Sequence, residues 1–126
     1  MTQSEIEEYF YDQCKDFGVE VWLTDSFPWD SIDDERIAII VGHNQPSRYW
    51  NNCYVKINWL VPDINTEANK IRLKEIESSM KVLHRGGGDG FRYSLDRTSV
   101  ENDSQLRCHY VNITLLFQSQ NILSNE

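Results

Sequence analysis

The chain has 126 residues and a mass of 14.8 kDa, a size typical of one domain with a single hydrophobic core. Apolar residues make up 40% of it and charged residues 25%, a composition that excludes a wholly disordered chain. The formal net charge is −8 and the pI about 4.8. This charge argues against sequence-independent wrapping of nucleic acid and against docking on an anionic membrane, because both need a surplus of positive charge.

The charge is distributed unevenly along the chain. Residues 1–35 contain eleven acids and one base, Lys15, whereas residues 36–126 contain nine acids and eleven bases. Two interpretations stay open. Either the chain meets other copies of itself through unlike patches, head to tail, or an acidic helix face and an acidic loop are simply solvated.

Three cysteines, Cys14, Cys53 and Cys108, are far apart and odd in number, and no CxxC motif occurs. We therefore expect reduced, buried thiols and no disulfide framework. The first residues lack a basic segment followed by an apolar one, so we expect no secretory signal. The longest purely apolar run, residues 37–41, is too short to span a bilayer, so we expect a soluble protein with no membrane partner.

The first predicted element is a helix over residues 5–17. Ser4 and Glu7 fit a capping box, and Gly18 fits the position after the helix where a left-handed residue is needed. Apolar residues at helical spacing form one stripe, and alternation over 19–23 then predicts a half-buried strand. The stripe consists of Ile6, Tyr9, Phe10, Cys14 and Phe17.

Two polar loops with large aromatic residues interrupt the next strands. Residues 25–35 form the first loop, and the β-branched run 36–42 after it predicts a central strand. Residues 43–52 form the second loop, and the alternating stretch 53–61 predicts another strand that ends at Pro62.

A second helix is predicted to begin at a cap provided by Asn65 or Thr66 and to run to about His84. The glycine-rich segment 85–90 then predicts a flexible connection. Two strands follow, at 91–98 and 106–118, separated by a turn at 101–104, and the polar tail 119–126 is expected to fray.

Together these elements predict a single α+β domain over residues 1–126. The expected order is α-β-β-β-α-β-β, with a mostly antiparallel sheet and two helices packed on one face.

The candidate chemical groups do not form a recognisable reactive site. The glycines at 85–90 close a helix and open a strand, which is the reverse of a phosphate-binding loop. His43, His84 and His109 lack metal-ligand spacing, and neighbouring strand residues Cys108 and His109 point to opposite faces. We therefore predict no catalytic residues, no metal, no cofactor and no enzymatic activity.

The aromatic residues of the two loops are more informative. An aromatic side chain in a polar loop is either packed onto its own core or serves as an anchor for a partner. The second possibility predicts an interface formed by Trp29, Asp33, Asp34, Glu35, Arg48, Tyr49 and Trp50. Basic residues that could meet the acidic stretch of another copy are Arg48, Lys56, Arg92 and Arg97.

The layout resembles a known family. The segment Tyr54-Val-Lys-Ile-Asn-Trp-Leu-Val-Pro-Asp-Ile-Asn-Thr, followed by Glu67-Ala-Asn-Lys-Ile-Arg-Leu-Lys-Glu-Ile, resembles the central strand, polar loop and sheet-packed helix of the tail terminator (tail-completion) proteins of long-tailed bacteriophages. The likeness extends over about residues 4–118, including the alternating last strand, and is one of topology. The family has no catalytic residues to carry over.

This resemblance implies a structural virion protein. Tail terminators form a hexameric ring on the last ring of the tail tube, stop its growth and provide the surface that joins the head. The implied partners are copies of the same chain, the tail tube protein and head-to-tail connector proteins. DNA would pass through the pore without specific binding, and the protein would be made in the host cytoplasm and end in the virion.

Two alternatives stay open. One is another ring of the head-to-tail connector, such as a neck, stopper or adaptor protein with the same small α+β format. The other is a bacterial small-molecule-binding or enzymatic α+β domain, which should have a preformed cavity with converging polar groups.

Overall fold

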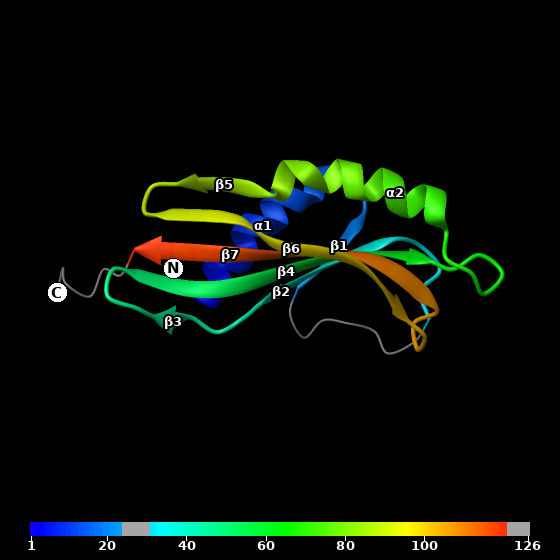
Figure 1. Cartoon of the computed structure of the whole chain (residues 1–126), viewed down its shortest axis with the longest axis horizontal. Coiled ribbons are helices and arrows are strands. Elements are labelled where there is room, and N and C mark those ends of the chain that lie inside the picture. The colour runs from blue at the N-terminus through cyan, green and yellow to red at the C-terminus, as the bar shows by residue number, and fades with distance from the viewer. Residues whose placement is uncertain (24–30, 121–126) are drawn as a thin grey trace.

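One seven-stranded sheet organises the structure, a computed structural model that describes residues 1–23 and 31–120. The strand order is β1-β2-β4-β7-β6-β5, and β3 pairs with the start of β4, on the same edge as β2 (Figure 1). Only β1 and β2 run parallel; the other pairs are antiparallel. The elements in chain order are α1 (Gln3–Cys14), the 3-10 turn η1 (Lys15–Phe17), β1 (Glu20–Trp22), β2 (Arg36–Val41), β3 (Gln45–Pro46), β4 (Trp50–Pro62), α2 (Lys70–Ser79), the 3-10 turn η2 (Met80–Leu83), β5 (Arg85–Gly88), β6 (Phe91–Asp103) and β7 (Cys108–Gln120).

The predicted fold class is confirmed in its main features: a mixed α+β fold with two helices and a mostly antiparallel sheet. The predicted order is wrong in detail, because β3 and β5 are two further strands. The run at residues 36–42 does form a strand, β2, but the middle of the sheet is the long pair of β4 and β7.

Both helices contribute to one core on the same side of the sheet, which we call the helix face. Alternate residues of β2, β4 and β7 point into this core, as the period of two in a strand requires. Its helical members are Ile6, Phe10 and Cys14 of α1 and Leu73 and Ile76 of α2. The opposite side, the outer face, holds a smaller apolar cluster of Ile32, Ala38, Leu60, Leu106 and Cys108.

The first helix and its cap each begin two residues earlier than predicted. Thr2 and Glu5, not Ser4 and Glu7, form the capping box, with Thr2 N donating to Glu5 Oε1 at 3.0 Å. The sequence contains both overlapping motifs, and the earlier one allows Gln3 Nε2 to donate to Gly42 O at 2.9 Å. Gly18 has φ 77°, as its predicted position requires.

The second helix begins later than predicted, because Asn65 and Thr66 are not its cap. Both have positive φ, 49° and 68°, in a turn that Ile64 and Glu67 close through two backbone hydrogen bonds. Asn69 caps the helix instead and accepts from Arg72 N at 3.2 Å.

The glycine-rich segment is a strand and not the expected flexible connection. β5 pairs with the first four residues of β6, in a register that places Gly86 opposite Tyr93. A Cβ at Gly86 would collide with the phenol ring of Tyr93, so glycine is needed for this close approach. Tyr93 in turn lies edge-on to Phe10 and is 3.1 Å from the Tyr9 hydroxyl, so this edge is packed against α1.

β6 is five residues longer than the predicted strand 91–98, whereas β7 has the predicted length but lies two residues later than 106–118. β6 and β7 each span 13 residues and are joined by a short turn at 104–107, with one bulge between Leu95 and Arg97. Ser119 and Gln120 belong to β7, and Ser119 is buried, so the expected fraying tail does not begin at 119. Residues 121–126 lie outside the described residues.

Candidate functional site

The acidic part of the predicted interface lies just before β2. Asp33 and Asp34 form an exposed bend, and neither makes a hydrogen bond or ion pair with another described residue. Glu35 differs: its carboxylate accepts from Arg72 Nε at 2.6 Å, from Arg72 Nη2 at 2.9 Å and from Trp59 Nε1 at 2.9 Å. The side chain of Glu35 is therefore occupied within the chain, and the surface available to a partner here is Asp33 and Asp34.

Arg72 also explains the electrostatics of Glu35. The hydrogen bonds from the guanidinium hold the pKa of this carboxyl below its ordinary value, and the indole N–H of Trp59 acts in the same direction against partial burial. The ion pair ties the N-terminal end of α2 to the entrance of β2 across 37 residues of sequence.

The aromatic part of the predicted interface lies around the other end of β4. β3 and β4 form a small hairpin, so residues 43–52 are more ordered than the predicted loop. Tyr49 is 66% exposed at the turn, with the guanidinium of Arg48 5.3 Å from its ring centre. Trp50 is the first residue of β4 and is half-buried beneath Arg92, whose guanidinium lies 4.3 Å from the ring centre.

The predicted interface residues are thus divided between two places. Residue 36 pairs with residue 60, near the C-terminal end of β4, whereas 48–50 lie at its N-terminal end. Trp29 lies outside the described residues.

Strand register brings three of the four predicted basic residues together on the outer face. Asn52, Gln118 and Arg92 form one cross-strand row, in which Arg92 Nε donates to Gln118 Oε1 and Gln118 Nε2 donates to Asn52 Oδ1, both at 2.9 Å. Lys56 and Arg97 flank Thr114 in another row. Both are exposed, and Tyr54 beside Lys56 is 46% exposed. The outer face therefore presents basic and aromatic side chains together, a combination the strand period alone could not reveal, because it does not give the pairing of distant strands.

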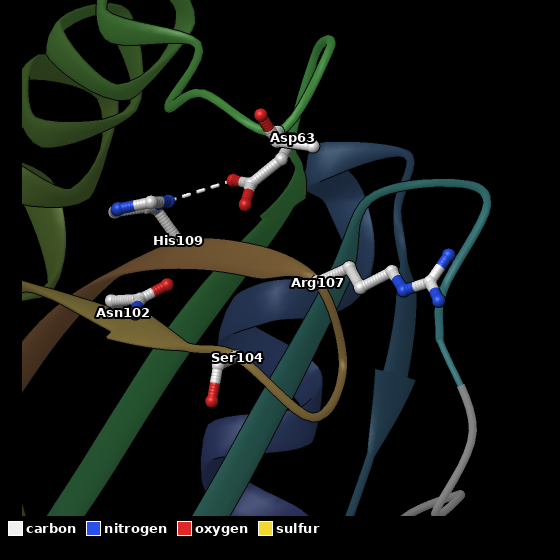
Figure 2. Close-up of a pocket in the computed structure, with 6 residues that line it drawn as sticks. Asp63, Asn102, Ser104, Arg107 and His109 are labelled. Carbon is white, nitrogen blue, oxygen red and sulfur yellow. Dashed lines mark hydrogen bonds and ion pairs between the residues drawn. The ribbon is translucent and has the colours of Figure 1, made fainter.

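A pocket of about 700 Å³ lies at the end of the sheet where β4 stops and β7 begins (Figure 2). Its lining residues are Asp63, Thr66, Asn102, Ser104, Arg107 and His109. His109 Nδ1 is 2.7 Å from Asp63 Oδ1, and both side chains are mostly buried. Figure 2 shows the guanidinium of Arg107 pointing away from this pair.

The backbone around this pocket is unusual. Within residues 1–23 and 31–120, the non-glycine residues with positive φ are Asn65, Thr66 and Arg107, and the last two line the pocket. Thr66 is β-branched, so a φ of 68° is strained and is imposed by the turn that follows Asp63. The Asp63–His109 pair fastens that turn to β7.

The pocket has some residue types of a hydrolytic triad without its geometry. His109 is oriented by a carboxylate, but the hydroxyl of Ser104 points away from the imidazole in Figure 2, so no nucleophile is aligned. Across the described part of the chain, no group of three or more His, Cys, Asp or Glu residues could hold a metal ion. His84 lies apart from the pocket lining, and burial together with Lys81 lowers its pKa.

The pocket was missed from the sequence, since Asp63 and His109 are 46 residues apart. Only Pro62 and Asp63 after a strand, and a histidine beside the buried Cys108, pointed to this place. The predicted burial of the cysteines is confirmed: Cys14, Cys53 and Cys108 are all buried.

These features describe an α+β domain with one helix-covered face and one polar, basic-aromatic face. The fold resembles that of a solved protein chain, with a TM-score of 0.58 over 96% of this chain and 97% of that chain, at 12% sequence identity. At this identity the likeness concerns the fold alone. No protein-family model matches the sequence, and neither does a curated protein. Among the described residues no helix is long and apolar enough to cross a membrane.

Proposed function

We propose that this protein is a ring-forming structural subunit of a phage virion, a tail terminator that caps the tail tube and joins it to the head. One observation carries the proposal: an acidic patch on the first helical segment and a group of three basic side chains on the outer face lie on opposite sides of the same sheet. The solvent side of α1 exposes Glu5, Glu8 and Asp12, and η1 after it exposes Asp16. The outer face exposes Lys56, Arg92 and Arg97.

Unlike patches suit a closed ring, because such a ring uses a heterologous interface in which one patch of each subunit meets a different patch of the next. Charge complementarity would set the orientation and the association rate, while aromatic anchors would supply most of the affinity. Trp50 and Tyr49 lie next to the basic surface and fit that second part.

The choice of a tail terminator ring rests on the resemblance in sequence layout. That resemblance runs from the strand at 54–62 through the polar loop into the helix. A neck, stopper or adaptor ring would use the same format, so the partner decides between them. The enzymatic alternative has less support, because the pocket around Asp63 and His109 lacks an aligned nucleophile.

The test is the mass of the assembly, by light scattering, with negative-stain images of the protein alone and with tail tubes. We expect a sixfold ring that binds the end of a tube. Lys56→Glu should weaken the ring, whereas Lys74→Glu on the exposed side of α2 changes the charge equally and should not. A ring that binds only a head connector would show that the protein is a neck protein and not a tail terminator. A protein that forms no ring, either alone or with tail tubes, would overturn the proposal.

A further inference from the structure

The edge of β6 that faces away from β7 is long, and most of it pairs with no strand in the described part of the chain. β5 covers only Phe91, Arg92, Tyr93 and Ser94, so residues 95–103 have β7 on one side and no partner strand among the described residues on the other. The hydrogen bonds and other contacts of these nine residues are all made with described residues. A strand edge of this length is a template for pairing with another strand.

Leu95 packs against the core that the helices cover, but beyond it most side chains of this segment are exposed on both faces. Thr98, Val100 and Asn102 are exposed on the helix-face side, and Val100 is 46% exposed despite being apolar. Arg97 and Glu101 are exposed on the outer-face side. An incoming strand would therefore meet the backbone edge and both rows of side chains without displacing any described element.

The sequence of this edge is complementary to itself. When two copies pair antiparallel about Ser99, residue 97 of one copy lies opposite residue 101 of the other, and 98 lies opposite 100. Arg97 then faces Glu101 twice, and Thr98 faces Val100 twice, which are favourable cross-strand pairs. Ser99 Oγ already donates to Glu101 Oε2 at 3.0 Å, so Glu101 is oriented along the strand before any partner arrives.

The register about Ser99 also uses the whole free edge, since Ser99 is the middle residue of 95–103. A register about Val100 would place Arg97 opposite Asp103, but Asp103 Oδ1 already accepts from Leu106 N at 3.0 Å in the turn to β7. The register about Ser99 leaves that turn intact.

We propose that two copies of this chain pair through their β6 edges, antiparallel about Ser99, to form a twofold dimer with one continuous sheet. This contact is isologous and closes at two subunits, so it is distinct from the heterologous contacts of a ring and does not depend on the proposed function. It buries only a strip one strand wide, so the dimer is expected to be weak and to depend on protein concentration.

Sedimentation of the full chain over a range of concentrations, with charge reversal and its compensation, tests the pairing. Arg97→Glu and Glu101→Arg each place like charges opposite one another and should each raise the dimer dissociation constant about tenfold. The double variant R97E/E101R restores opposite charges across the twofold axis and should recover the dimer. Lys74→Glu, far from the edge on α2, is the matched control and should leave it unchanged.

Cross-linking gives a second measurement, on variants that keep the edge charges. Ser99→Cys places two thiols opposite each other and should give a covalent dimer under mild oxidation. Ser94→Cys, on the part of β6 that β5 covers, should not. Three results would overturn the proposal. The protein could remain a monomer at every concentration, both single reversals could leave the dimer dissociation constant unchanged, or the double variant could dimerise no more tightly than the single variants. The same result in Val100→Cys as in Ser99→Cys would overturn the register.

Discussion

Glu35 and Arg72 form a bidentate ion pair, with Nε–Oε2 at 2.6 Å and Nη2–Oε1 at 2.9 Å, and the indole of Trp59 completes the arrangement at 2.9 Å. The guanidinium also lies over that indole, 5.6 Å from the ring centre. An acidic residue in a run of acids thus has a role inside the fold, where it joins β2, β4 and α2.

Replacement of Glu35 by glutamine should destabilise the protein by about 1 kcal/mol, because a charge-assisted pair becomes a neutral hydrogen bond at a partly exposed site. Urea unfolding measures this cost. Glu75→Gln is the control. The Glu75 side chain is 61% exposed and comes no nearer than 4.0 Å to the Arg72 guanidinium, so this variant should change the free energy of unfolding little.

The cost of Glu35→Gln should depend on pH. The pKa of Glu35 is depressed in the folded protein by Arg72, so the stability this carboxylate contributes is fully present above its unfolded pKa and is lost as the pH falls through the folded pKa. Wild type and E35Q should therefore differ by a constant amount above about pH 5 and converge in more acidic solution. A difference that grows on acidification would contradict this assignment.

Reversal of Asp33 and Asp34 to lysine should weaken ring formation while leaving the fold intact. Both are exposed and make no polar contact with another described residue. The defect should grow as salt is lowered, because like charges are then screened less. Light scattering at two ionic strengths measures it. Glu35 should be kept, because a triple variant that also contains Glu35→Lys would lose stability as well as assembly. Unchanged assembly of the double variant at low salt would refute the role of Asp33 and Asp34.

Truncation of Tyr49 to alanine should separate binding from stability. Tyr49 is 66% exposed, so loss of its side chain should change the free energy of unfolding by less than about 0.5 kcal/mol. If Tyr49 is an anchor, the same variant should reduce assembly strongly. Val82→Ala, at a 72% exposed apolar residue of η2, is the control that should affect neither.

The three thiols should be unreactive in the folded protein. Burial raises the pKa of Cys14 and Cys108 to about 12 and that of Cys53 to about 11, so almost no thiolate exists near neutral pH. A disulfide reagent at pH 8 should modify them only at the rate of unfolding and should react rapidly in denaturant. Fast modification of any one thiol under native conditions would show that its site opens locally.

The periodic elements could be predicted from the sequence because each depends on its own residues. The stripe of Ile6, Phe10 and Cys14 and the left-handed Gly18 were such cases, and both are present. Elements that depend on a distant partner could not be predicted in this way. β5 has no apolar pattern, and it is a strand because Gly86 allows Tyr93 to approach.

The candidate sites show the same division. The exposure of Asp33 and Asp34 could be expected of an acidic loop, whereas the sequence left open whether Tyr49 packs onto the core. The internal role of Glu35 and the pairing of Asp63 with His109 require the register of strands and the position of α2, which link residues 37 and 46 positions apart. Two overlapping capping motifs at the N-terminus were equally good locally, and the contact of Gln3 with Gly42 favours the earlier one.

The central position of β7 has a consequence for how the chain folds. The last described strand, β7, pairs along all of its length with β4 and with nearly all of β6, so the sheet cannot close until residues 108–120 have left the ribosome. Until then, β4 and β6 have no neighbour between them, and the aromatic cluster around Phe117 is incomplete. Such non-local pairing is typical of slow folding, and it leaves the edges of β4 and β6 exposed to aggregation until β7 is inserted.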